Sequence, residues 1–253
     1  MLEAAIRRDR VVMAAGLAAL TGLAWIYVVR MAATSSGAGM AMAMPGMEAG
    51  GTPGLPWLIG MWAVMMVAMM LPSAAPTILL FGGVSRRRRM QGQPAVSVAV
   101  FTLGYLAVWT LYAALAASAQ WELHRLALLS PSMAAATPVL AGGLLIAAGA
   151  YQWLPIKGGC LSHCRSPLHV FATEWREGVR GALVMGMRHG TFCVGCCWLL
   201  MALLFVAGVM NLLWVAVIAG FVLVEKLVPQ GQWLGRAAGI GLVAWGVWVL
   251  LAR

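Results

Sequence analysis

Long, nearly uncharged apolar runs recur along this chain, and they constrain its fold more than any other feature of the sequence. About 20 consecutive apolar residues are what an α-helix needs to cross the hydrocarbon core of a bilayer. Of the 253 residues, 62% are hydrophobic and only 9% are charged, which is too little charge to cover a soluble domain of this size. The sequence therefore predicts an all-α fold, a polytopic membrane helical bundle without a separate soluble domain.

The apolar runs predict about seven transmembrane helices, with approximate bounds 11–30, 57–84, 95–118, 134–154, 190–208, 211–227 and 233–251. We divide the chain into an N-terminal anchor helix at 1–30, a Met- and Gly-rich outer loop at 31–56, and a six-helix metal-binding membrane domain at 57–253. The first run is long for the core of a signal peptide and lacks a good cleavage site, so we interpret it as a retained anchor. The arginine-bearing segment 176–190 is either an interfacial helix or the first turns of the fifth span.

Basic residues lie between the apolar runs and indicate the topology. The formal net charge is +10. The residues concerned are Arg7, Arg8, Arg10, Arg86 to Arg89, Lys157, Arg165, Arg176, Arg180, Arg188, Lys226 and Arg236. If alternate loops face the cytoplasm, nearly all of these lie on the cytoplasmic side, as the positive-inside rule requires. This predicts a multi-pass membrane protein with its N-terminus inside, surrounded by lipid and without a nucleic-acid partner.

One apolar run, RHGTFCVGCCWLLM at 188–201, contains an arginine, a histidine and three cysteines. At 100° per residue, Cys193, Cys196 and Cys197 share one face of a helix with His189. A single buried cysteine is usually a small apolar packing residue. Three of them one turn from a histidine indicate a metal or redox site instead. One straight helix rarely closes four ligands on an ion, so a second segment is expected to contribute.

The segment CLSHC supplies suitable residues, because Cys160, His163 and Cys164 lie within one turn of each other and on the same side of the membrane in our topology. That side faces a reducing compartment, where structural disulfides are uncommon. An odd number of cysteines in such a compartment favours free thiols or thiolates. We therefore expect the two cysteine groups to form one metal site near the cytoplasmic face.

Ionisable residues inside a span are costly, and two of them lie in the sequence VEKLVPQG. Glu225 is expected either to pair with Arg188 or Lys226, or to supply a carboxylate to the metal site. A third alternative is that its side chain reaches the membrane interface. For Lys226 this interfacial position is the expected one.

The chain contains 18 methionines, and they are concentrated in two places. Met40, Met42 and Met44 lie in the outer loop, whereas Met61, Met65 and Met69 follow helical spacing in the second span. Thioether sulfur is a soft, uncharged ligand that suits Cu(I). The methionines therefore predict a path for Cu(I), although those of the span also fit a gap-filling core.

Several of these stretches resemble a bacterial family of predicted metal-binding integral membrane proteins. The resemblance runs from about residue 57 to the C-terminus, through MMVAMMLPSAAP, YQWLPIKGGCLSHCRSP, GTFCVGCCWLLM and VEKLVPQG. It implies metal binding in the bacterial inner membrane. The cysteines on the matching motifs are Cys160, Cys164, Cys193, Cys196 and Cys197. The choice of copper rests on ligand softness and not on the resemblance.

The expected function is that of a copper (Cu(I)) binding integral membrane protein, not an enzyme. It would act as a carrier or metallochaperone in cuproenzyme assembly, with a membrane or periplasmic cuproprotein as partner. Zinc is a less favoured ion. Two alternatives remain open: a membrane thiol–disulfide oxidoreductase using Cys193 and Cys196, and a zinc-stabilised membrane scaffold. The sequence contains no nucleotide-binding loop, so an ATP-driven pump is not expected.

Overall fold

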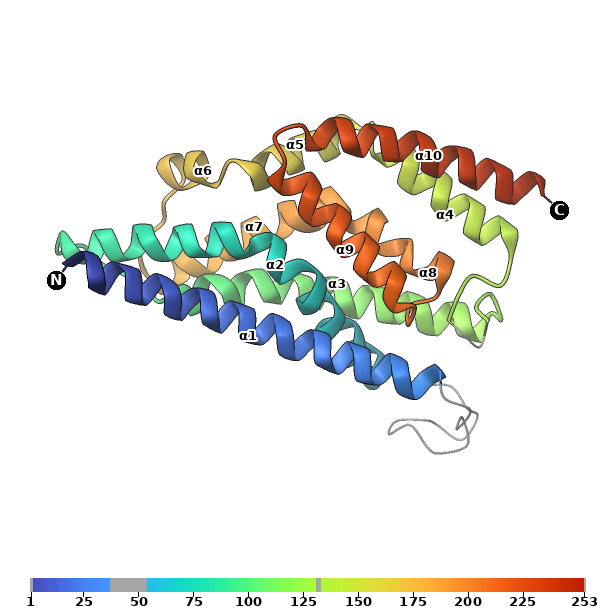
Figure 1. The fold of residues 1–253 in the computed structure, drawn as a ribbon, viewed down its shortest axis with the longest axis horizontal. Helices are drawn as coiled ribbons and strands as arrows, with labels where there is room; N and C mark the ends of the chain where they lie inside the picture. Colours follow the sequence, from blue (N-terminus) through green and yellow to red (C-terminus); the bar gives the residue numbers. More distant parts are fainter. Residues whose placement is uncertain (1, 37–53, 131–132, 253) are drawn as a thin grey trace.

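In a computed structural model, which describes residues 2–36, 54–130 and 133–252, the chain is a bundle of α-helices (Figure 1). The helices are α1 (Leu2–Ser36), α2 (Leu55–Met90), α3 (Val98–Arg125), α4 (Pro138–Tyr151), α5 (Pro155–Arg165), α6 (Pro167–Thr173), α7 (Gly178–Ala202), α8 (Leu204–Ala207), α9 (Leu212–Leu227) and α10 (Gly231–Leu251). These described residues contain no strand, so the predicted all-α fold is confirmed.

Five segments are long and apolar enough to cross a membrane: α1, α2, α3, α7 together with α8, and α10. Helices α4 and α5 add a sixth if the bent pair is one span. All seven predicted spans are helical, but the sixth of them, α9, has only 16 residues. At 1.5 Å per residue it extends about 24 Å, short of the roughly 30 Å hydrocarbon core. The described chain therefore has five or six full-length spans by length and composition.

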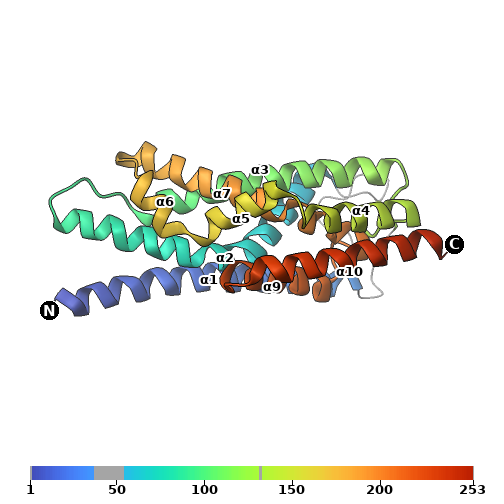
Figure 2. The ribbon, with the colours of Figure 1, turned by 90° about the horizontal axis from the view of Figure 1, so that it is seen from above.

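The long helices run side by side along the molecule, and the two chain ends lie at its opposite ends (Figures 1 and 2). Helix α1 packs on α2, α2 on α3, and α3 on α7, whereas α4 pairs with α10. Helix α9 contacts both α2 and α10 and so joins the two groups. The interior between α2, α7 and α9 is where the candidate site lies.

Helices α3 and α7 approach each other closely because glycines lie at their crossing. A Cβ atom at Gly104 would collide with the backbone of Leu183, and one at Gly186 would collide with the backbone of Phe101. Small residues at helix crossings allow this close approach in membrane proteins. Helix α7 runs unbroken from Gly178, so segment 176–190 mainly forms the first turns of the fifth span and is not a separate interfacial helix.

The polar segment after α4 differs from the expected loop, because most of it is helical. Pro155 cannot donate the backbone hydrogen bond that would continue α4, and its ring clashes with the preceding turn. The chain therefore restarts as α5 at an angle of 64° to α4. This bend lays α5, which carries CLSHC, against α7 (Figure 2).

Candidate metal centre

The three cysteines of α7 are all buried in the middle of the bundle. The exposed fractions of Cys193, Cys196 and Cys197 are 1%, 1% and 0%. The thiols of Cys196 and Cys197 each donate to the carbonyl oxygen of Cys193, at 3.1 and 2.9 Å. His189, one turn earlier, is also buried, so the shared face predicted from the helical spacing turns inward.

Helix α5 brings the second cysteine group to α7, as the sequence predicts. Cys164 is buried and is a neighbour of Cys196 where α5 packs on α7. Cys160 is packed against Gly195, where an added Cβ would lie 2.8 Å from its sulfur. All five cysteines are free, so they are available as thiols or thiolates.

The closest polar side chain to the α7 cysteines is that of a lysine. The Lys226 Nζ lies 2.9 Å from the Cys193 Sγ and 3.1 Å from the Ser73 Oγ. Lys226 is only 8% exposed, so the expected interfacial position is wrong. The last turn of α9 directs this side chain inward, whereas the next residues, Leu227 and Val228, are exposed. A cation beside a sulfur atom stabilises the thiolate, which is the form that binds metals.

Tyr105 of α3 completes the surroundings of Cys193. Its hydroxyl lies 3.2 Å from the Cys193 Sγ and 3.1 Å from the backbone carbonyl oxygen of Met70. The Ser73 hydroxyl donates to the same Met70 carbonyl at 2.9 Å. Cys193 is therefore held by side-chain contacts from two other helices, α3 through Tyr105 and α9 through Lys226. Nothing in the sequence distinguishes Tyr105, because an aromatic residue in an apolar span is ordinary packing.

The methionine in contact with the thiols is Met70, a neighbour of the predicted ligands. The Cys197 Sγ lies 3.8 Å from the Met70 Sδ. Met61, Met65 and Met69 are buried in the core of α2, and no contact joins them to a cysteine or histidine side chain among the described hydrogen bonds. The predicted outer-loop ligands Met40, Met42 and Met44 lie outside the described residues.

Glu225 is held by a lysine that the sequence analysis did not pair with it. Its carboxylate forms a buried ion pair with Lys157 of α5, with 2.5 Å between Nζ and Oε1. Lys157 also donates to the side-chain oxygen of Gln152. The expected pairing of Glu225 with Arg188 is wrong, because Arg188 pairs with Glu174. A cavity of about 150 Å³ adjoins the Lys157–Glu225 pair, which is room for a few water molecules.

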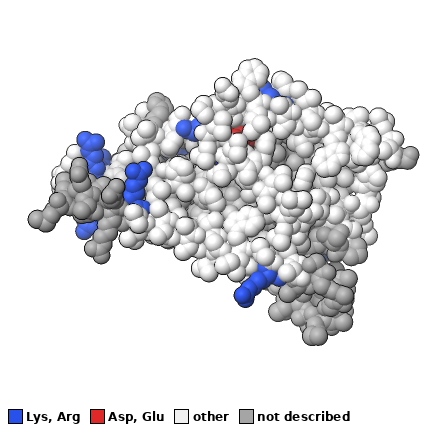
Figure 3. All heavy atoms as spheres, viewed as in Figure 1, with Lys and Arg blue, Asp and Glu red and all other residues white. Residues whose placement is uncertain are grey.

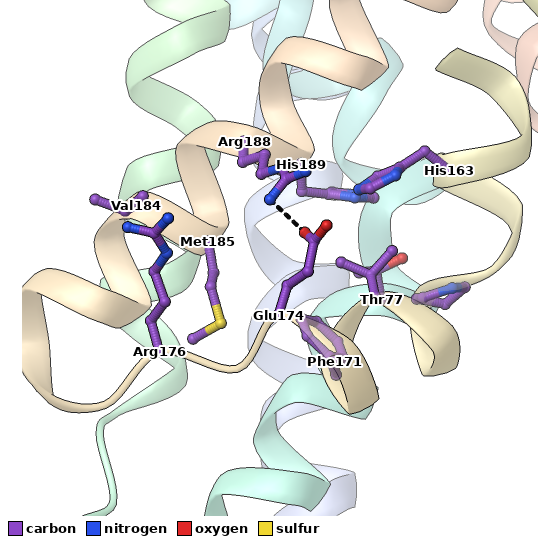
Figure 4. Close-up of a pocket in the computed structure, with 11 residues that line it drawn as sticks. Thr77, His163, Phe171, Glu174, Arg176, Val184, Met185, Arg188 and His189 are labelled. Atoms are coloured by element: carbon purple, nitrogen blue, oxygen red, sulfur yellow. Dashed lines mark ion pairs between the residues drawn. The ribbon is translucent and has the colours of Figure 1, made fainter. Parts of the chain in front are cut away.

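His163 and His189 lie next to each other at a second, smaller cavity (Figure 4). The cavity measures about 20 Å³, enough for one water molecule. The His163 ring is stacked on Phe192, with 3.8 Å between ring centroids. Figure 4 shows the Glu174 carboxylate directed at the Arg188 guanidinium above the cavity. The two predicted histidine ligands are therefore together, within one turn of the α7 cysteines.

Four cysteines and one methionine gather where α2, α5 and α7 meet. Cys164 is a neighbour of Cys196, and Cys193 and Cys196 are neighbours of Cys197, whose Sγ lies 3.8 Å from the Met70 Sδ. We call these five residues the sulfur cluster. Across the part of the chain that the structure describes, no three His, Cys, Asp or Glu side chains are arranged as a ready-made metal-binding group. The arrangement offers pairs of soft donors, which suit Cu(I) better than an ion that requires four ligands.

A family model described as PpoB2, copper chaperone, matches residues 59–249, a range that includes the sulfur cluster, both lysines and both histidines. Neither curated proteins nor solved structures give a match.

Proposed function

The chain belongs to the PpoB2 family of copper chaperones, and on that premise we propose that it carries Cu(I) within the membrane and delivers it to a cuproprotein. The sulfur cluster is the proposed site of the cargo. In this proposal the protein is not an enzyme, because the ion is bound and released without chemical change. We place it in the bacterial inner membrane, with the N-terminus inside and the domain 57–253 holding the metal.

The observation that carries the proposal is the burial of four thiols where α5 packs on α7, with the Cys197 Sγ 3.8 Å from the Met70 Sδ; Cys164 of α5 and Cys196 of α7 are neighbours there. Thiolate and thioether sulfur are the donors that select Cu(I). Structural zinc almost always takes four ligands in a tetrahedron, and the pairwise contacts of the sulfur cluster do not supply one. The Cys164–Cys196 pair supports a site of low coordination number, and Cys197 with Met70 supports a second one beside it.

Charge balance favours the same ion. Two thiolates and one Cu(I) carry a net charge of −1, and the buried ammonium of Lys226 next to Cys193 brings the total to zero. Zn²⁺ bound by the same two thiolates would be neutral, so the total including Lys226 would be +1. An uncompensated charge in the interior of a membrane protein costs several kcal/mol. Lys226 therefore supports a preference for the monovalent ion.

Side chains beside the sulfur cluster suggest a route by which the ion reaches and leaves it. His163 and His189 line a cavity beside the sulfur cluster together with Met185, and imidazole nitrogen and thioether sulfur both bind copper. We assign these side chains to the passage of the ion between the cluster and the cytoplasmic side. Met40, Met42 and Met44 are assigned to the outer side, with Met61, Met65 and Met69 lining the route along α2. Glu225 is assigned to holding Lys157 and α5 in place.

The test is the metal content of the full-length protein, purified in detergent without oxygen and offered Cu(I) or Zn²⁺. The native chain should retain copper, and the double variant Cys164→Ser/Cys196→Ser should lose most of it. A variant with all five cysteines replaced by serine sets the background. Circular dichroism of each variant verifies that the helical fold is kept. Equal copper in the native chain and the all-serine variant would refute the site.

The same preparation separates the alternatives. A zinc-stabilised scaffold would retain Zn²⁺ in preference to Cu(I). A thiol–disulfide oxidoreductase would bind neither, and alkylation of Cys193 and Cys196 would change with added oxidant. The burial of both thiols at 1% exposure argues against that last outcome, because a partner's thiol would have to reach them to exchange a disulfide.

Deletion of residues 38–47 tests the outer methionines and should slow copper acquisition without altering the copper bound at saturation.

A further inference from the structure

A groove of about 1340 Å³ runs along α2 between α1 on one side and α5 with α6 on the other. It is separate from the sulfur cluster and has no role in the proposed function. Along α2 its lining extends from Pro72 to Met90, which is about 27 Å of helix at 1.5 Å per residue. This volume exceeds the roughly 300–1,000 Å³ typical of small-molecule pockets, so the groove fits an extended occupant.

The two ends of the groove differ in chemistry. From Pro72 to Leu80 the α2 lining is apolar, whereas Arg86 and Arg87 line it about two turns further on. Arg10 of α1 and Arg165 of α5 add two more guanidinium groups. Figure 3 shows several Lys and Arg side chains at the end of the molecule where the N-terminus lies, and almost none along the middle of this face. The groove is therefore amphipathic along its length.

Most of the positive charge in the groove is not neutralised by the protein. Asp9, the one carboxylate in its lining, pairs with Arg86. Arg165 donates to the backbone carbonyl oxygens of Val228 and Pro229, which fixes its position without cancelling its charge. Among the described residues, Arg10 and Arg87 form no ion pair with a carboxylate. Four arginines and one aspartate leave three positive charges in excess, in a groove whose remaining lining is largely apolar.

We propose that this groove binds one anionic phospholipid, with its acyl chains along Pro76 and Leu79 and its phosphate at Arg10 and Arg87. At about 27 Å along α2, the groove is long enough for one phospholipid, because one leaflet with its headgroups is roughly 20 Å thick. Basic pockets between membrane helices on the cytoplasmic side bind anionic headgroups by charge complementarity. The lipid would hold α1 against α2 and α5, and thereby support the helix that carries Cys164.

The test uses the full-length protein, stripped of lipid in detergent and then supplied with phosphatidylglycerol or phosphatidylcholine of identical acyl chains. Native mass spectrometry counts bound lipid, and thermal unfolding measures its effect. Phosphatidylglycerol should bind with one-to-one stoichiometry and raise the unfolding temperature, and phosphatidylcholine should do neither. Glycerol 3-phosphate, the headgroup without chains, should not reproduce the effect. Equal effects of the two lipids, or a full effect of glycerol 3-phosphate, would overturn the proposal.

Two pairs of variants locate the lipid. Arg10→Gln/Arg87→Gln should weaken phosphatidylglycerol binding about 25-fold, at about fivefold for each arginine near an anionic headgroup. The matched control Arg89→Gln/Arg180→Gln removes the same charge outside the groove and should change binding little.

Gly83 lines the groove and has no atom within 4 Å of an added Cβ, so Gly83→Leu should fill the groove and block the lipid. Gly60→Leu, at another such glycine of α2, is its control, and equal losses in either pair would refute the groove as the site.

Discussion

The ammonium group of Lys226 on α9 lies 2.9 Å from the thiol sulfur of Cys193 on α7, inside the bundle. Both side chains are more than nine-tenths buried. A buried cation is stable only if it is paired or well hydrogen-bonded, and its other partner here is the neutral hydroxyl of Ser73. The pair therefore links the charge of Lys226 to the state of the sulfur cluster.

Methionine in place of Lys226 is also unbranched and similar in length, but it has no charge. We expect the affinity for Cu(I) to fall at least tenfold, because hydrogen bonds to charged groups contribute about 1.5–3 kcal/mol. Competition with a Cu(I) chelator of known affinity measures the change. Arg125→Met removes one charge at an exposed position of α3 and should leave the affinity unchanged. An unaltered affinity in Lys226→Met would contradict the charge-balance argument.

Replacing Met70 by leucine tests the thioether that touches Cys197. The swap nearly conserves volume, and such changes usually cost less than about 1.5 kcal/mol of stability. Copper affinity should decrease in Met70→Leu and remain native in Met66→Leu, which alters an equally buried methionine of the same helix. X-ray absorption at the copper edge should show one fewer sulfur neighbour in the Met70 variant. Identical spectra for both variants would exclude Met70 from the site.

Replacing Glu225 by glutamine leaves Lys157 buried without its counter-charge. Removing one partner of a buried ion pair costs about 3–5 kcal/mol, so the unfolding temperature in detergent should drop clearly. The double change Lys157→Met/Glu225→Leu should recover much of the loss, because neither charge of this ion pair then remains buried. The copper content of the double variant separates two roles for Glu225: it stays native if the residue holds α5 in place and falls if the carboxylate is itself a ligand.

Replacing Gly186 by alanine tests the crossing of α3 and α7. The added methyl group meets the backbone of Phe101, and backbone cannot move aside as a flexible side chain can. Overpacking of this kind costs about 1–3 kcal/mol, which thermal unfolding would detect. Gly143→Ala changes a helical glycine with no neighbour within 4 Å of its added Cβ and should be neutral or slightly stabilising. Equal unfolding temperatures for the two variants would show that the crossing tolerates a side chain.

The sequence by itself determined the all-helical fold and the main elements of the candidate site. An apolar run can be recognised from neighbouring residues alone, and a chain segment that crosses a bilayer has to form a helix or part of a closed barrel. Each predicted span is therefore found as a helix. The face shared by Cys193, Cys196 and Cys197 follows from 100° of rotation per residue. Their meeting with Cys164 was also predictable, because both segments lie on one side of the expected topology.

Only the tertiary structure decided which side chains complete the site. One residue along a helix turns the side chain by 100°, so the choice between Met69 and Met70 depends on how α2 is rotated against α7. The same rotation, applied to the end of α9, sends Glu225 to Lys157 and Lys226 to Cys193. These rotations result from the packing of helices that are far apart in the sequence. The 64° bend before α5 and the glycine contacts between α3 and α7 help to determine that packing. Hydropathy and spacing contain no information about such contacts, because they describe each helix alone.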